Sequence, residues 1–218
     1  MSIGWRERIG EYQSQAISAG VDIVDINDAK RQQYLGLQLF LENKIATGLL
    51  TKTKQILPTT ITDKLYWQDP SSIHLSLQST LLGDRVIDDA KILSLSDNLE
   101  SFFKSSKAMD GHLMFPIFAK SGIIGICDQI DTIYGLRKNM TDIWNKNKLQ
   151  PGLSEEYWNF PHIFLGRFIA GLTPAESKIL VDLPIQSVET KLVKVKLCLS
   201  DKFISPETVK VIREFKLN

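Results

Sequence analysis

Residues 73–78 read IHLSLQ, and residues 159–168 read NFPHIFLGRF. In the first stretch apolar residues alternate with polar ones, and this period of two predicts a strand whose polar face carries His74, Ser76 and Gln78. The second stretch predicts a similar strand, with one face formed by Ile163, Leu165 and Arg167 and the other by His162, Phe164 and Gly166. Each strand follows a short turn-like element, DPSS or FP, and each begins with a histidine.

Two histidines in this setting suit acid–base chemistry on a phosphodiester, provided that their strands are neighbours in one sheet. Both imidazoles then face one cleft. The unperturbed pKa of imidazole is near 6.5, so one ring can accept a proton while the other donates one. Ser76 points the same way as His74 and can donate a hydrogen bond to a non-bridging phosphate oxygen. His112 has Met114 two residues further on and is expected to be structural.

The paired pattern resembles the two-histidine (2H) phosphoesterases, in which the motif His-x-[Ser/Thr]-hydrophobic occurs twice. That superfamily includes the LigT-like RNA 2′,3′-cyclic phosphodiesterases. Pro161-His162-Ile163 and Leu165-Gly166-Arg167 resemble the usual surroundings of the second motif. The closing strand pair of the family is matched by VKVKLCLS at residues 193–200 and IREFKL at residues 212–217. The resemblance covers about residues 65–218.

The resemblance implies a bilobal α+β fold, in which two antiparallel sheet lobes face a central cleft and the helices lie outside. It also implies cleavage of a phosphodiester in a nucleotide or short oligonucleotide, without a metal or cofactor. The substrate classes are 2′,3′-cyclic phosphates, 2′,5′-oligoadenylates and cyclic nucleotide signals. His74, Ser76 and His162 carry over as catalytic residues, and the assignment of acid and base stays open.

The second motif departs from the family pattern at position 164, where Phe164 replaces serine or threonine. A phenyl ring cannot donate to phosphate, and the loss of one such donor typically costs about 10²- to 10³-fold in rate. The ring could instead stack on a base, close off the site or mark a degenerate enzyme. Further candidates for substrate contacts, each with an ordinary structural alternative, are Gln78, Tyr157, Trp158, Lys194 and Lys196. The basic run around Arg137 on a predicted helix is expected to be solvated.

Residues 1–60 match the family only loosely and are expected to be a helical elaboration of a domain at residues 61–218. One amphipathic helix is predicted at residues 4–18, and a second runs from an N-cap at Asn27 or Asp28 to about residue 47. Residues 57–62 suit a loop or an edge strand. Further along, the pattern predicts a hairpin around Lys120-Ser121-Gly122, a helix over 128–147, one long strand over 188–200 and a final strand.

The composition is that of an ordinary globular chain of 218 residues with a formal net charge of +1. Near-neutral charge argues against a nucleic-acid coat and against long RNA as substrate. Cys127 and Cys198 are expected to be buried thiols, and the absence of an apolar leader or membrane-spanning run indicates the cytosol. Two alternatives to an enzyme stay open: a degenerate module that binds a nucleotide or RNA end, and an interaction protein that uses its helical first third.

Overall fold

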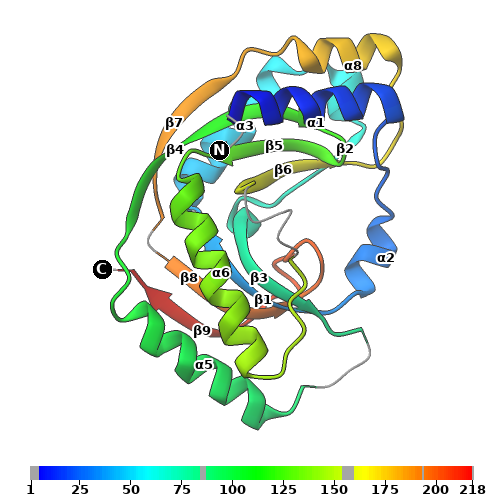
Figure 1. Ribbon diagram of the computed structural model, residues 1–218. Coiled ribbons are helices and arrows are strands. Elements are labelled where there is room, and N and C mark those ends of the chain that lie inside the picture. Colours follow the sequence, from blue (N-terminus) through cyan, green and yellow to red (C-terminus); the bar gives the residue numbers. More distant parts are fainter. Residues whose placement is uncertain (1–4, 84–86, 154–159, 193, 218) are drawn as a thin grey trace.

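The computed structural model describes residues 5–83, 87–153, 160–192 and 194–217 (Figure 1). Within these residues nine strands form one antiparallel sheet in the order β7-β4-β5-β6-β3-β1-β8-β9, and β2 pairs with β6. The strands are β1 (Tyr34–Phe40), β2 (Leu65–Trp67), β3 (His74–Leu81), β4 (Met109–Ala119), β5 (Gly122–Cys127), β6 (His162–Phe168), β7 (Gln186–Leu192), β8 (Lys194–Ser200) and β9 (Lys210–Lys216).

The sheet is divided into two halves where β3 meets β6. These two strands share the single residue pair Leu75–Ile163, whereas the ladders on either side of them are longer. One half contains β7, β4, β5, β6 and β2, and the other contains β3, β1, β8 and β9. Figure 1 shows that the sheet is strongly curved. The expected α+β fold with two antiparallel lobes is therefore confirmed.

Helices pack against both halves of the sheet. They are α1 (Trp5–Ala19), α2 (Ile26–Arg31), α3 (Asn43–Ile56), α4 (Thr59–Thr62), α5 (Asp89–Phe103), α6 (Ile130–Lys146) and α8 (Pro174–Val181), with the 3₁₀ turn η1 (Pro70–Ser72). Helix α1 lies beside α8 and contacts β4, while α6 contacts β3 and lies beside α5 (Figure 1). Ile9 of α1 is buried against Ile124 and Phe160, so this helix covers part of one sheet face next to the cavity described below.

The prediction for residues 28–47 is wrong. Residues 34–40 form β1, which pairs with β3 on one side and β8 on the other. The short helix α2 is capped by Asp25, whose side chain accepts from the backbone N–H groups of Asn27 and Asp28. Leu35, Leu37 and Leu39 alternate with Gly36 and Gln38, a period of two that fits the observed strand, whereas the helix prediction followed Tyr34, Leu37 and Leu41 at helical spacing.

The position of β1 also corrects the expected division at residue 60, because the first 60 residues supply a central strand of the sheet. Two smaller expectations change as well. Residues 59–62 form the helix α4 rather than a loop or strand, and the stretch expected as one strand over 188–200 contains β7 and β8, which lie in different halves of the sheet. The first helix, the hairpin of β4 and β5, helix α6 and the last strand are confirmed.

The main core lies between the sheet and its helices and includes Trp144, Phe103 and Phe168. Cys127 and Cys198 are free and buried, as expected. Among the described residues, no helix combines the length and the apolar character needed to cross a membrane.

Candidate active site

A cavity of about 580 Å³ lies between the two halves of the sheet. Strand β3 contributes His74, Ser76 and Ser79 to its lining, and strand β6 contributes His162, Phe164 and Arg167. The two motifs that the sequence singled out therefore face the same space. Gln38 of β1 and Arg137 of α6 also line this cavity.

The pairing of β3 with β6 determines how the two motifs face each other. Leu75 and Ile163 are partners in an antiparallel pair, and each directly follows a motif histidine. Continuing this register by one residue in each direction places Phe164 opposite His74 and Ser76 opposite His162. The two histidines are then diagonal neighbours on one face, a relation that corresponds to about 7–8 Å in a regular ladder. A phosphate group fits between two imidazoles at that spacing.

Each histidine ring is held in the same way by its own strand entry. The Nδ1 atom of His74 lies 2.7 Å from the carbonyl oxygen of Ser72, and that of His162 lies 3.0 Å from the carbonyl oxygen of Phe160. A carbonyl oxygen only accepts, so Nδ1 must carry the proton in both rings. In the neutral form the lone pair is then on Nε2, which leaves that atom as the proton acceptor.

The cavity lowers the pKa of both histidines to about 4. Burial is the main cause in each case, because it disfavours the charged ring, and the positive charge of Arg167 acts in the same direction. For His162 the charges of Arg137 and His74 add to the effect. At neutral pH both rings are therefore neutral in the free protein, and a bound phosphate anion would favour protonation of one of them.

The double replacement His74→Asn and His162→Asn is expected to make the fold less sensitive to acid. Between about pH 6.5 and pH 4 the unfolded chain binds protons that the folded histidines do not, so wild-type stability falls as the pH is lowered through this range. The slope is up to about 1.4 kcal/mol per pH unit for each histidine. Urea unfolding measured across this range should give a shallower pH dependence for the variant. An unchanged slope would contradict the assignment, and His112→Asn, at an exposed histidine beside Asp128, is the matched control.

The guanidinium of Arg167 was not predicted to lie in the site. Strict alternation along β6 places this residue on the face opposite His162. The ladder with β5 shifts between Ile123 and Ile124, which pair with Gly166 and Phe164, so Leu165 is an extra residue on β6. This bulge turns Arg167 to the side of His162 and Phe164, where it lines the cavity.

Arg167 is held by aromatic rings rather than by a carboxylate. Its guanidinium carbon lies 3.4 Å from the centroid of the Phe164 ring and 5.7 Å from that of Phe203. Its Nε atom is buried without a hydrogen-bond partner, and no ion pair of Arg167 occurs among the described residues. Burial lowers the pKa of Arg167 to about 10, so the group stays charged at neutral pH. An anion in the cavity would thus meet a cation that forms no ion pair among the described residues.

Arg137 corrects the expectation of a solvated helix face. It is only 2% exposed, it lines the cavity, and its Nε atom donates to the carbonyl oxygen of Ser76 at 3.0 Å. Burial lowers its pKa to about 10. The side chain therefore joins α6 to the first motif and adds a second positive charge at the cavity wall.

A second bulge removes Gln78 from the site. Leu37 and Gln38 of β1 pair with Gln78 and Ser76, so Leu77 is an extra residue on β3. Gln78 is fully buried away from the cavity lining, where its amide donates to the Thr141 hydroxyl at 2.7 Å and accepts from the backbone N–H groups of Ser79 and Leu153. Its expected substrate contact is therefore not supported.

The two lysine candidates are not brought into the cavity lining. Lys194 is exposed and pairs with Glu214 at 3.4 Å. Lys196 lies 4.6 Å from the centroid of the Phe40 ring, which in turn contacts His74, but it does not line the cavity. Tyr157 and Trp158 lie outside the described residues. Within the described part of the chain, no three His, Cys, Asp or Glu side chains gather in a way that could hold a metal ion.

Solved structures with a similar fold include phosphoesterases. TT0787 of Thermus thermophilus has a TM-score of 0.58 and 17% identity over 85% of this chain and 97% of its own length. E. coli LigT in complex with 3′-AMP has a TM-score of 0.60 and 14% identity over 86% of this chain and 99% of its own length. A structure described as a phosphoesterase gives a TM-score of 0.58 at 13% identity over 86% of this chain and 99% of its own length. No protein-family model matches the chain, and no curated protein matches it significantly.

At such low identity the likeness establishes the fold. The chain shares the fold of E. coli LigT and TT0787, in agreement with the fold expected from its two motifs. These neighbours are aligned over nearly their whole length, so about a seventh of this chain has no counterpart in them.

Proposed function

We propose that this protein is a phosphodiesterase that cleaves a nucleotide or short oligonucleotide by two-histidine acid–base catalysis, without a metal ion. The observation that carries the proposal is the matched pair of His74 and His162. Both line one cavity, both donate Nδ1–H to a carbonyl two residues earlier, and both leave Nε2 for proton transfer. E. coli LigT, which shares the fold, has been crystallised with 3′-AMP, ATP and NADP⁺.

The proposed step on a 2′,3′-cyclic phosphate requires one neutral and one protonated histidine. The neutral ring takes a proton from water as the water oxygen forms a bond to phosphorus. The bond from phosphorus to one ribose oxygen breaks, and the protonated ring gives its proton to that oxygen. The phosphate anion itself raises the pKa of the acid above its value in the free protein, because an opposite charge nearby favours the protonated ring.

Three further groups line the cavity where negative charge develops on the phosphate. The Ser76 hydroxyl supplies a neutral donor, and the guanidinium groups of Arg167 and Arg137 supply two charges. Charge-assisted hydrogen bonds are about twice as strong as neutral ones, so a guanidinium can replace a missing hydroxyl. Lys120 and Lys202 also line the cavity, but Asp22 and Asp201 line it too, and this small number of cations favours a small substrate over a long polyanion.

The proposed activity is tested by incubating the purified protein with excess EDTA and a panel of substrates. The panel holds 2′,3′-cyclic nucleotides, 2′,5′-oligoadenylates and cyclic di- and trinucleotides. We expect turnover of at least one class, at a rate that EDTA does not change. Turnover that is lost with EDTA and restored by a divalent cation would contradict the metal-independent mechanism.

A binding module for nucleotides or RNA ends is the second candidate, and the observation that favours it is Phe164. This ring occupies the position of the second motif hydroxyl, opposite His74. A module of this kind would bind a nucleotide in the cavity and show no turnover of any member of the panel. Calorimetric titration with 3′-AMP beside the activity assay separates the two candidates.

A further inference from the structure

A column of cations and aromatic rings runs from Lys30 of α2 through Tyr66 of β2 and Phe203 of the loop after β8 to β6, where it ends at His162. Lys30 lies 5.9 Å from the centroid of the Tyr66 ring, and Tyr66 lies 4.9 Å from Phe203. Next in space comes Arg167, whose guanidinium carbon is near the Phe203 ring and closer to the Phe164 ring. The Phe164 ring packs edge to face against the His162 ring, with the two ring centroids 5.1 Å apart. Arg167 thus contacts an aromatic ring of β6 closely and lies near a second ring, from the loop after β8.

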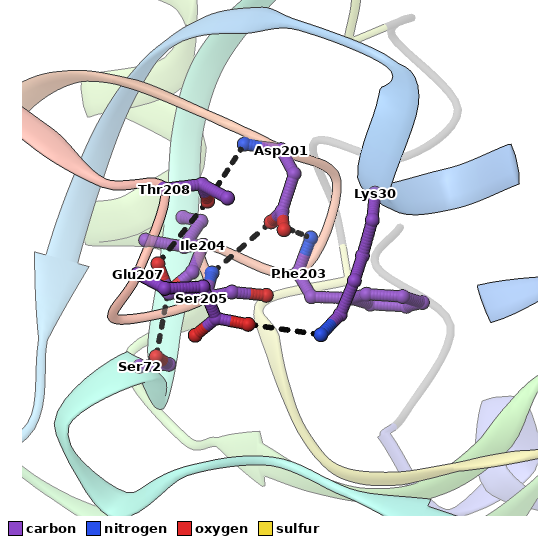
Figure 2. Close-up of polar contacts among 8 residues, drawn as sticks. All are labelled: Lys30, Ser72, Asp201, Phe203, Ile204, Ser205, Glu207 and Thr208. Carbon is purple, nitrogen blue, oxygen red and sulfur yellow. Dashed lines mark hydrogen bonds and ion pairs between the residues drawn. The ribbon is translucent and has the colours of Figure 1, made fainter. Parts of the chain in front are cut away.

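The loop that carries Phe203 is fixed by its own hydrogen bonds (Figure 2). The Oδ1 atom of Asp201 accepts from the backbone N–H groups of Phe203 at 2.8 Å and Ser205 at 3.0 Å. Ser72 donates its hydroxyl to the carbonyl oxygen of Ile204 at 2.6 Å. Ser72 also accepts from His74 through its carbonyl group, so one residue ties this loop to the first motif.

Two more contacts hold the outer end of the column in place. Lys30 of α2 forms an ion pair with Glu207 of the loop at 2.9 Å (Figure 2). The amide of Gln68 donates to the carbonyl oxygen of Phe203 at 3.2 Å. Phe203 is fully buried, so its ring is a rigid wall on one side of the Arg167 guanidinium.

The other wall is Phe164, and the distances show that it is the closer one. A guanidinium carbon 3.4 Å above a ring centroid indicates a stacked arrangement, which restricts the plane of the guanidinium. A serine or threonine at position 164 would have a hydroxyl but no surface on which that plane could rest. With phenylalanine at position 164, the site lacks a weak neutral hydroxyl donor. In its place it has an aromatic surface on which the charged Arg167 guanidinium stacks.

We propose that Phe164 is a positioning residue, whose ring orients the Arg167 guanidinium toward the phosphate in the cavity. This inference rests on the proposed function, because it assumes that the cavity binds a phosphate. On this account Phe164 does not mark a degenerate enzyme. The second motif then contacts phosphate through Arg167, five places after His162, without a hydroxyl two places after it.

The decisive variant is Phe164→Thr, which restores the hydroxyl of the family pattern and removes the platform. If Phe164 positions Arg167, this variant binds 3′-AMP and inorganic phosphate more weakly than wild type, by roughly 3- to 30-fold, as expected from the loss of a cation–π contact. If the only effect of Phe164 is that the site lacks a hydroxyl donor, the variant binds these ligands more tightly and turns substrate over faster. Tighter binding or faster turnover would overturn the proposal.

Three companion variants separate positioning from packing. Phe164→Leu should weaken phosphate binding to a similar extent, and Phe164→Tyr should keep it within about twofold, because tyrosine retains the ring. In an Arg167→Met background, Phe164→Leu should have little further effect, since the group that the ring positions is absent. Equal losses in both backgrounds would overturn the proposal. Phe102→Leu, at a half-buried ring that contacts Phe103 outside the cavity lining, controls for loss of a phenyl ring.

Calorimetric titration keeps this test separate from the test of catalysis. A wild-type protein that binds 3′-AMP without turnover contradicts the proposed hydrolysis, and the binding ratios of the variants still decide the role of Phe164. A wild-type protein that binds neither 3′-AMP nor inorganic phosphate overturns both proposals.

Discussion

Replacement of either cavity histidine by asparagine is expected to lower kcat/KM on the best substrate of the panel by at least about 10²- to 10⁴-fold. Among the described titratable groups that line the cavity, His74 and His162 are arranged for proton transfer. Each donates its Nδ1–H to a backbone carbonyl oxygen, which leaves Nε2 to exchange a proton with the substrate. Asparagine can still donate to that carbonyl, so the strand entry is preserved while the proton-transfer atom is lost. Steady-state kinetics of both single variants and the double variant provide the measurement.

The double variant adds a second criterion. When two groups act in one proton-transfer mechanism, the loss of both should cost little more than the loss of one. If the loss of kcat/KM in the double variant equals the product of the losses in the two single variants, the two histidines act independently. That result would contradict the paired mechanism. A His74→Asn or His162→Asn variant with near wild-type kcat/KM would exclude the mechanism outright, and His112→Asn shows the effect of the same change at an exposed position.

The sequence was sufficient for the parts of the fold in which apolar and polar residues keep a regular period. Alternation identified the starts of β3 and β6, and the helical period identified α1 and α6. The pairing of β3 with β6, however, could not be derived from alternation, because a period of two says nothing about which strands are neighbours. The resemblance of the paired motifs to a known family supplied that information.

The sequence failed where a local event changes the period. One bulge in β6 turns Arg167 into the cavity, and one bulge in β3 turns Gln78 out of it. Neither bulge has a signature in the sequence, since the extra residues Leu165 and Leu77 are ordinary strand residues. Both errors are therefore the same error, in which alternation was extended past a point where the ladder shifts.

The other large error is the helix predicted where β1 lies, in a stretch whose residues fit two periods at once. Strand β1 lies between β3 and β8, and all of its residues from Leu35 to Phe40 are buried. Leu35, Leu37 and Leu39 keep the period of two of a strand, but Tyr34, Leu37 and Leu41 also fit the spacing of a helical stripe, and the prediction followed the helical spacing. Arg137 was misjudged for a different reason, because a charged residue among lysines on a helix is usually solvated, and only the contact of α6 with β3 buries it.

Replacement of Arg167 by methionine is expected to lower kcat/KM by about 10²- to 10³-fold, comparable to the loss of an oxyanion donor in other enzymes. The guanidinium lines the cavity, keeps its charge with a pKa of about 10, and forms no ion pair among the described residues, so a bound phosphate would be its counter-charge. Methionine keeps the length of the side chain and the contact with Phe164 but has no charge. The measurement is steady-state kinetics together with calorimetric titration of 3′-AMP.

Arg167→Lys distinguishes a planar donor from a simple positive charge. A lysine ammonium carries the same charge but cannot stack flat between Phe164 and Phe203 or offer paired donors. We therefore expect Arg167→Lys to recover only a small part of the loss seen with methionine, with the deficit visible in both kcat and phosphate affinity. Full recovery would show that charge alone is needed and that the aromatic walls have no role in the site. Arg213→Lys, in a surface ion pair with Asp97, is the matched control and should leave both quantities unchanged, because that pair lies outside the cavity.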